Sequence, residues 1–314
     1  MLDEMAPKMV PLLPHAQRIL SEGDTPDRRA SDTRFWVEEP MAILREFLDS
    51  KGEKRARVVA NELGVMSNTS RLRAEHAIAF EGRRDLDAEA EEMLYAFWNI
   101  VGVKATRLSA IGGGASLTRA KIGTSSALYS LGWTKHARQA AVAIEAMIRF
   151  DATLDRRKVI PGPIRYDMHP IGWLEVLSIR HVLKQPITIK PEGDESEVRA
   201  YEDLAAGWDS PDQTRFDELF GLACDAYMEH CTVERDRTDG SRGVSKWLRP
   251  YGLEAFLRGR SDKGLELPGL DHPVFSPAPS RDVRQSVEVP DLPSEVTDAL
   301  HLLDRLSDNI LFDA

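Results

Sequence analysis

Apolar residues recur every three or four positions along most of this chain, which is the spacing of one face of an α-helix. The pattern is clear in PMAILREFLDS, EEMLYAFWNIVGV, ARQAAVAIEAMIRF, IGWLEVLSIRHVLK and RFDELFGLACDAYMEHC. It is also clear near the C-terminus, where the apolar stripe consists of Val296, Ala299, Leu303, Leu306 and Ile310. These segments predict amphipathic helices that each bury one side against their neighbours.

Several residues mark where helices begin. Pro170 suits the first turn of a helix, because its missing N–H would have no partner there. Asp87 precedes AEAEEMLYAFW, where acidic residues complement the helix dipole. Evidence for strands is limited to a short alternation in PITIKPE. We therefore expect an all-α fold, an irregular bundle of antiparallel helices with at most a minor β-hairpin.

The charged segment EGRRDLDAE is a candidate boundary within this bundle. It would separate an N-terminal helical segment, residues 1–85, from a main helical domain, residues 86–314, on which the segment packs. A single domain over residues 1–314 is the alternative. The expected core anchors are large apolar residues of several helices: Trp98, Leu128, Trp133, Ile144, Phe150, Trp173, Leu177 and Leu222.

The stretch VVANELGVMSNTSRLR, Val58 to Arg73, has part of the pattern of a DNA-binding helix-turn-helix. Ala60 supplies the small residue of the first helix and Gly64 the turn. Ser70, however, stands where an aliphatic residue should pack the second helix onto the first. The favoured interpretation is an amphipathic helix that ends at Gly64 as its C-cap. A DNA-binding regulator with a degenerate helix-turn-helix is kept as an alternative.

The net charge of −10 and a pI near 5.4 disfavour nucleic acid as the partner, because binding phosphates requires Lys and Arg. No apolar run approaches the roughly 20 residues of a membrane span. The first residues, MLDEMAPKMV, make a poor export signal. The only cysteines are Cys224 and Cys231, expected as a buried reduced pair. These features indicate a cytoplasmic protein without a membrane partner.

Motifs for catalysis or metal binding are missing from the sequence. The glycine-rich AIGGGASLTRAKIGTSS lacks the Gly-Lys-Ser/Thr spacing of a phosphate loop and favours a connection between helices. The histidines are scattered, without His-Glu-x-x-His or Cys-x-x-Cys, so we expect no metal and no cofactor. We expect a protein that is not an enzyme. A helical enzyme of unrecognised type is a further alternative, which would need a polar cavity around Asp167, His169 or Glu175.

The segment YGLEAFLRGRSDKGLELPGLDHPVF has a distinctive order of residues. Its marked positions are Tyr251, Glu254, Arg258, Gly264, Leu265, Pro268, Asp271, His272 and Pro273. This order resembles the C-terminal signature of helical immunity proteins of bacterial polymorphic toxin systems. The resemblance runs from about Ala120 to Phe275 and includes LYSLGWTKHARQAA and YEDLAAGWDSPDQTRFDELFGLACDAYMEH. Gly252 departs from it, because such segments often have Pro there.

The resemblance implies a protein that neutralises a cognate protein toxin by tight stoichiometric binding and occlusion. The residues of the segment itself favour structural roles. Glu254 and Arg258 have the spacing of a helical i,i+4 ion pair, and His272 before Pro273 favours an extended turn that Asp271 can cap. We therefore expect Tyr251, Glu254, Arg258, Asp271, His272 and Pro273 to hold a corner of the fold.

Acidic surface is then the expected binding site, because complementary charge steers a basic partner, such as a nuclease toxin, toward it. Two segments concentrate this charge, and the region from Ser286 onward, with seven Asp or Glu against one Arg, is a third candidate. KPEGDESE, an expected exposed loop, contains Glu192, Asp194, Glu195 and Glu197. WDSPDQTRFDE contains Asp209, Asp212, Asp217 and Glu218.

Overall fold

The computed structural model describes residues 17, 21, 38–109, 111, 119–153, 169–191, 195–237, 248–269, 271–275 and 282–311. These residues are mostly helical and form no strand or sheet, so the predicted all-α fold is confirmed. The helices are α4 (Glu39–Asp49), α5 (Ala56–Glu81), α6 (Leu86–Leu108), α7 (Arg119–Ile122), α8 (Thr124–Ser130), α9 (Thr134–Thr153), α11 (Pro170–His181), α12 (Glu195–Gly207), α13 (Gln213–Arg237), α15 (Tyr251–Asp262), the short 3-10 helix η2 (Pro273–Phe275) and α16 (Ser294–Leu306).

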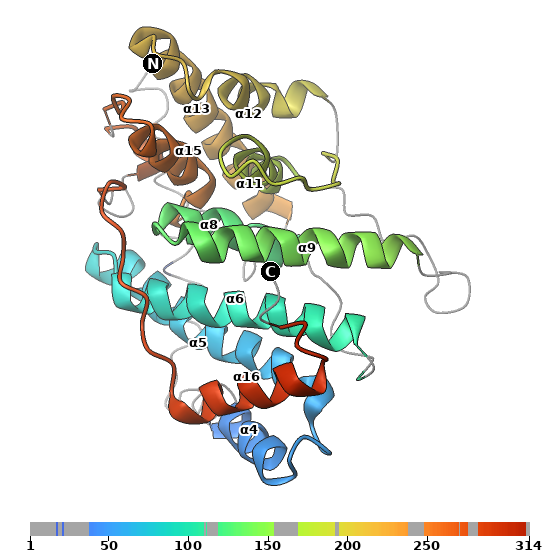
Figure 1. Cartoon of the computed structure of the whole chain (residues 1–314). Coiled ribbons are helices and arrows are strands. Elements are labelled where there is room, and N and C mark those ends of the chain that lie inside the picture. The colour runs from blue at the N-terminus through green and yellow to red at the C-terminus, as the bar shows by residue number, and fades with distance from the viewer. Residues whose placement is uncertain are drawn as a thin grey trace.

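The helices stack from one end of the molecule to the other (Figure 1). Helices α4 and α16 pack together at one end, followed by α5 beside α6 and then by α8 and α9. Helices α11, α12, α13 and α15 form the other end. The α12–α13 pair therefore lies far from α4 and α16.

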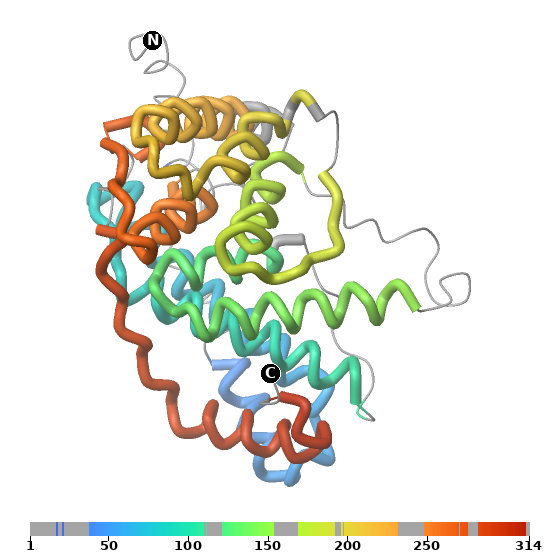
Figure 2. Tube along the Cα trace, turned by 45° about the horizontal axis from the view of Figure 1, so that its top comes forward, coloured from blue at the N-terminus to red at the C-terminus, as the bar shows by residue number. Residues whose placement is uncertain are grey.

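A segment outside the helices, residues 282–293, turns at residues 283–285 and then runs extended along one edge of this stack into α16 (Figure 2). It is bonded to the turn between α8 and α9. The N–H of Val287 donates to the carbonyl of Leu131 at 2.9 Å, and the indole Nε1 of Trp133 donates to the carbonyl of Val287 at 2.7 Å. The segment thereby ties the middle of the molecule to its α4–α16 end.

The core is one continuous apolar cluster that draws on every long helix described. Of the predicted core anchors, the buried ones are Leu128, Trp133, Ile144, Trp173 and Leu177. Trp98 and Phe150 are partly buried. The prediction for Leu222 is wrong, because its side chain is 56% exposed. No helix among the described residues is long and apolar enough to cross a membrane.

Helix α5 overturns both interpretations of Val58 to Arg73. It is one continuous helix of 26 residues, so the chain neither turns nor stops at Gly64. A Cβ on Gly64 would lie 2.9 Å from Nδ2 of Asn99 in α6, and this nitrogen donates a hydrogen bond to the carbonyl of Ala60. Gly64 therefore allows α5 and α6 to approach closely. The cap that ends the helix is Gly82, at φ 63°.

The predicted helix starts are close to the observed ones. Pro170 occupies the first turn of α11, as expected. Helix α6 begins at Leu86, before the predicted Asp87, because the Asp85 carboxylate accepts the N–H of Ala88 at 3.0 Å and caps the helix. The boundary suggested near residue 85 thus lies in the short connection between α5 and α6, two helices that pack against each other.

The alternating segment PITIKPE forms no hairpin within the described chain, although Ile187 and Ile189 are buried. The guanidinium of Arg180 donates to the carbonyls of both residues, with Nη2 at 2.6 Å from each oxygen. A side chain from α11 therefore satisfies backbone groups that would otherwise pair with a neighbouring strand.

Candidate partner-binding surface

Helices α12 and α13 each present a strongly apolar side to the rest of the protein. The buried residues of this side are Val198, Tyr201, Leu204, Ala205, Trp208, Phe216, Phe220, Ala223, Cys224, Tyr227, Met228 and Cys231. Their spacing of three and four residues places them on one face of each helix. Many of the remaining described positions of both helices face outward.

The outward side is mainly acidic. Among the side chains that the structure describes, its exposed acidic residues are Glu202, Asp203, Asp209, Asp212, Asp217, Glu218 and Glu229, whereas its exposed basic residues are Arg199 and Arg215. We call these acidic residues the α12–α13 acidic surface. It contains all four residues that the sequence predicted in WDSPDQTRFDE. This pair of neighbouring helices therefore presents an excess of negative charge to solvent.

Three of those four carboxylates already have partners within the protein. Asp209 pairs with Nζ of Lys263 at 2.6 Å, and this hydrogen bond lowers the pKa of Asp209. Asp212 caps α13 by accepting the N–H of Arg215 at 3.1 Å, and Asp217 accepts from Nε2 of Gln213 at 2.6 Å. Glu218 makes no such contact within the described part of the chain. Of these four carboxylates, Glu218 is therefore the most available for contact with another molecule.

The other predicted patch lies mostly beyond what the structure describes. Glu192 and Asp194 are outside the described residues, and the side chains of Glu195 and Glu197 are not described either. The backbone of Glu195 and Glu197 belongs to the first turn of α12, so the prediction of an exposed loop is wrong for these two residues. Carboxylates in a first helical turn complement the helix dipole.

Two outward residues of α13 were not recognised from the sequence. Leu222 lies two positions from both Phe220 and Cys224, and two positions correspond to a rotation of about 200° around a helix. Since Phe220 and Cys224 are buried, Leu222 must point away from the core, which explains its exposure. A Cβ on the adjacent Gly221 would meet no atom within 4 Å. The sequence did contain a sign that Leu222 points outward: the buried apolar residues of α13 follow a spacing of three and four positions, and Leu222 does not fit it.

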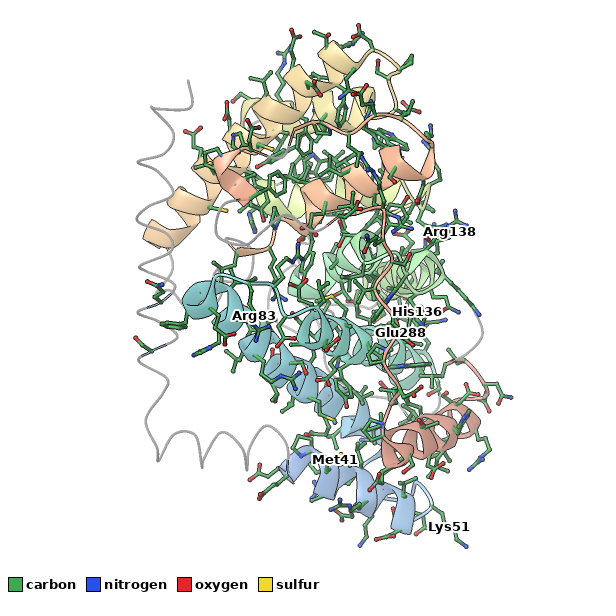
Figure 3. The ribbon with its side chains drawn as sticks, turned by 90° about the vertical axis from the view of Figure 1, so that its left-hand side faces the viewer. Met41, Lys51, Arg83, His136, Arg138 and Glu288 are labelled. Atoms are coloured by element: carbon green, nitrogen blue, oxygen red, sulfur yellow. The ribbon has the colours of Figure 1, made fainter. Side chains whose placement is uncertain are left out.

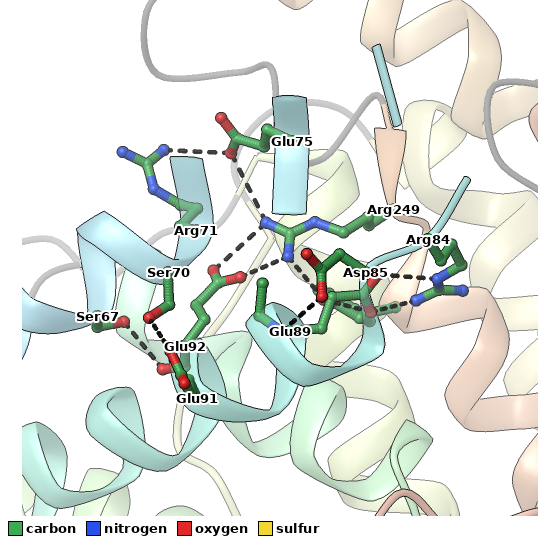
Figure 4. Close-up of polar contacts among 12 residues, drawn as sticks. Ser67, Ser70, Arg71, Glu75, Arg84, Asp85, Glu89, Glu91, Glu92 and Arg249 are labelled. Atoms are coloured by element: carbon green, nitrogen blue, oxygen red, sulfur yellow. Dashed lines mark hydrogen bonds and ion pairs between the residues drawn. The ribbon is translucent and has the colours of Figure 1, made fainter. Parts of the chain in front are cut away.

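The segment that carries the resemblance is part of a buried ion network (Figure 4). Arg249 bonds to the Glu92 carboxylate, to the Tyr251 hydroxyl at 2.9 Å, and approaches Glu75 at 3.6 Å. Its side chain is completely buried. The Tyr251 hydroxyl in turn donates to Glu89 at 3.2 Å. The network therefore joins α15 to α5 and α6.

A second arginine extends this network. Arg84 pairs with Glu89 at 2.6 Å and also with Glu254. Burial raises the pKa of Glu89, but the charge and hydrogen bonds of Arg84 outweigh burial, so the pKa lies below its ordinary value. Burial raises the pKa of Glu92 above its ordinary value, against the opposing charge of Arg249. The pKa values of these two glutamates, one helical turn apart, thus shift in opposite directions: Arg84 and Tyr251 bond to Glu89, whereas the charge of Glu75 adds to the effect of burial at Glu92.

The predicted ion pair between Glu254 and Arg258 is wrong. Glu254 is buried and pairs with Arg84, whereas Arg258 pairs with Asp262 at 2.9 Å. The fold brings Arg84 to the buried side of α15, and a buried carboxylate needs the nearest cation. Arg258 instead lies on the side of α15 that faces the segment 282–293, where it donates to the carbonyl of Val283 at 3.0 Å.

His272 links the end of the same segment to α13. Its Nε2 lies 3.0 Å from Oδ1 of Asp225, and its Nδ1 accepts the N–H of Val274 at 3.1 Å. Pro273 begins η2, and Asp271 is exposed. This corner of the chain therefore packs against α13, the helix that carries much of the acidic surface.

Two of the residues considered for an enzyme site lie at α11: His169 precedes this helix and Glu175 lies within it. The third, Asp167, is outside the described residues. Cys224 and Cys231 are buried free thiols, and burial raises the pKa of Cys224 well above its ordinary value. In the described ranges, no cluster of three or more His, Cys, Asp or Glu residues is arranged to hold a metal ion.

Comparison with known proteins leaves the chain without a relative that could assign its activity. No model of a known protein family, no curated protein sequence and no solved structure matches it. The acidic surface and the contacts described above are therefore the grounds for a functional proposal.

Proposed function

We propose that this protein neutralises a bacterial protein toxin by binding it stoichiometrically and covering its active site. The α12–α13 acidic surface is the observation that carries this proposal. It supplies the contact area, and the toxin supplies a basic surface, as expected for an enzyme that acts on nucleic acid. The protein itself performs no turnover in this proposal.

Electrostatic complementarity supports binding of this kind. A surface on which acidic residues greatly outnumber basic ones raises the rate of encounter with a basic partner by about 10- to 1000-fold, most strongly at low ionic strength. The helices that carry this surface are anchored by a continuous core and by Arg260, whose guanidinium donates to the carbonyls of Trp208 at 2.9 Å and Ser210 at 2.8 Å. The acidic turn between α12 and α13 is thereby held in a defined position.

Co-expression with the toxin encoded by the adjacent gene tests the proposal. The wild-type protein should protect cells, and purified protein should abolish toxin activity once it is equimolar with the toxin. Reversal of two exposed charges, Glu218→Lys with Glu229→Lys, should lower the association rate constant by about tenfold at low salt. The melting temperature should remain nearly unchanged, because isolated exposed charges contribute less than about 1 kcal/mol each.

Asp298→Lys provides the matched control. Asp298 is an exposed carboxylate within α16, at the opposite end of the molecule from α13. Its reversal should leave the association rate nearly unchanged. Failure of the wild-type protein to bind the toxin would contradict the proposed function, as would protection by a small fraction of one equivalent.

A further inference from the structure

We infer that Gly221 and Leu222 on α13 form the centre of the docking site, where a basic partner places an apolar side chain between its positive charges. This inference rests on the proposed function and identifies which part of the acidic surface makes the decisive contact. The occupant is a protein with lysine or arginine residues around an aliphatic or aromatic tip.

Gly221 is the first reason to select this place. A glycine in a helix interior weakens the helix relative to alanine, because it loses more backbone freedom on folding. Other helical glycines of this protein make room for a neighbour: a Cβ on Gly64 would crowd Asn99, and one on Gly259 would crowd Val182 and Trp208. A Cβ on Gly221 would meet nothing within 4 Å. Packing among the described residues therefore does not require glycine at this position. The close approach of another molecule would require it.

Leu222 is the second reason. Its exposed fraction, 56%, is the largest among the exposed large apolar side chains of the described chain. It stands directly beside the flat surface at Gly221, so a partner side chain can cover both residues together. Removal of this apolar surface from water would stabilise a complex. Contacts near the centre of an interface, where water is excluded, make the largest contributions to binding.

The surrounding residues define the charge of the partner. Glu218 and Asp225 lie one helical turn before and after Leu222, and Glu229 lies two turns after it. Glu218 and Glu229 are exposed, and Asp225 is half-buried beside His272. Arg215 is the exposed basic residue nearest to this group along the helix. An apolar centre with a predominantly acidic rim complements an apolar tip with a basic rim.

A second copy of this chain fits the same face poorly. In a symmetric pair of parallel helices, Glu218 and Glu229 would each meet their own copies. In an antiparallel pair centred on Leu222, Glu218 of each copy would approach Asp225 of the other. Like charges placed together oppose association. A basic partner gains from the same carboxylates. Charge therefore favours a different protein as the occupant.

The decisive experiment measures the affinity of the purified full-length chain for the toxin encoded by the adjacent gene. Leu222→Arg should weaken binding by about 30-fold or more, because it removes the apolar centre and opposes a basic partner. Gly221→Gln should also weaken binding, by about tenfold, because its side chain would cover the flat surface. Both variants should keep a melting temperature close to that of the wild type, because Leu222 is 56% exposed and a Cβ on Gly221 would meet no described atom within 4 Å.

Val142→Arg is the matched control for Leu222→Arg. Val142 is an apolar residue that is 42% exposed on α9, the helix that also carries Arg138 (Figure 3). Its replacement should leave affinity unchanged. Hydrogen exchange should slow in α13 when the toxin is added to the wild-type protein.

The outcomes separate this inference from the proposed function. If the wild-type protein does not bind or inhibit the toxin, the proposed function fails and the inference fails with it. If the wild-type protein inhibits the toxin and both α13 variants inhibit it equally well, only the inference is overturned. A wild-type dimer that Leu222→Arg dissociates would show that a second copy occupies the face, which also overturns the inference.

Discussion

Lys121 shows how burial alone changes the chemistry of a residue. This side chain, in the short helix α7, is partly buried, and burial lowers its pKa from 10.5 to about 8. The folded protein therefore binds this proton less tightly than the unfolded chain does. The stability that follows from this difference is present above pH 10.5 and is lost as the pH falls through about 8.

Lys121→Met should consequently stabilise the protein at neutral pH. The variant removes a charge that the folded state holds unfavourably, so the free energy of unfolding should rise by about 2 kcal/mol at pH 7. Its advantage should shrink as the pH rises from 8 to 10.5, because the wild-type lysine then loses its charge in both states. Urea unfolding of both proteins across this range measures the difference. If Lys121→Met raised the free energy of unfolding equally at pH 7 and pH 10.5, the charge of Lys121 would not be the cause.

At the scale of elements, the pairing of α5 with α6 depends on small residues at the contact. Gly64 faces Asn99, and a Cβ on Gly102 would lie 3.0 Å from Cβ of Ala60. Such an approach lets backbone and short side chains pack directly. The same property explains why α5 continues through a residue that resembles a turn or a cap: tertiary packing outweighs the weak helix propensity of one glycine.

Gly64→Val should therefore separate α5 from α6 and destabilise the protein. The added branched side chain would meet Asn99, and overpacking of this kind costs about 1–3 kcal/mol. Gly221→Val is the control, because the same substitution in α13 enters open space and should change stability by less than about 0.5 kcal/mol. Thermal or urea unfolding distinguishes the two. If both variants changed the stability equally, the helix propensity of valine, and not its contact with Asn99, would explain the effect at Gly64.

At the scale of the whole molecule, the buried network around Arg249 connects distant parts of the chain. Arg249 and Glu92 are 157 residues apart, and Arg84 and Glu254 are 170 residues apart. These contacts hold α15 against α5 and α6 and so join one end of the stack of helices to the α5–α6 layer. Hydrogen-bonded pairs allow these charges to be buried, and each arginine serves more than one acceptor.

Arg249→Met should be strongly destabilising, by about 3–5 kcal/mol, because it leaves the carboxylate of Glu92 buried without its cation. The double variant Arg249→Met with Glu92→Met should recover much of this loss, since it removes both charges. Unfolding measurements, or soluble yield if the single variant does not fold, provide the comparison. A double variant that is no more stable than Arg249→Met would contradict the role of the ion pair.

The resemblance to immunity proteins and the acidic character both came from the sequence, but the arrangement of their residues did not. The sequence placed Tyr251 and Glu254 in one segment and suggested that they are structural, which stays a prediction. It paired Glu254 with the wrong arginine, because i,i+4 spacing describes only neighbours on the same helix. It also placed Leu222 in the core, because an apolar residue in an apolar segment does not by itself show which way it points.

Local pattern by itself determined that this chain forms helices, where several of them begin, and which faces of most helices are buried. Pro170 and the stripe of Val296, Ala299 and Leu303 required no knowledge of distant residues, since helix geometry repeats every 3.6 residues. Only the tertiary structure decided that Gly64 is a packing contact, that Arg84 serves Glu254 and that Gly221 and Leu222 face outward. Each of these roles depends on which helix packs beside the residue. The neighbouring helix is determined by the three-dimensional packing of residues that are far apart in the sequence.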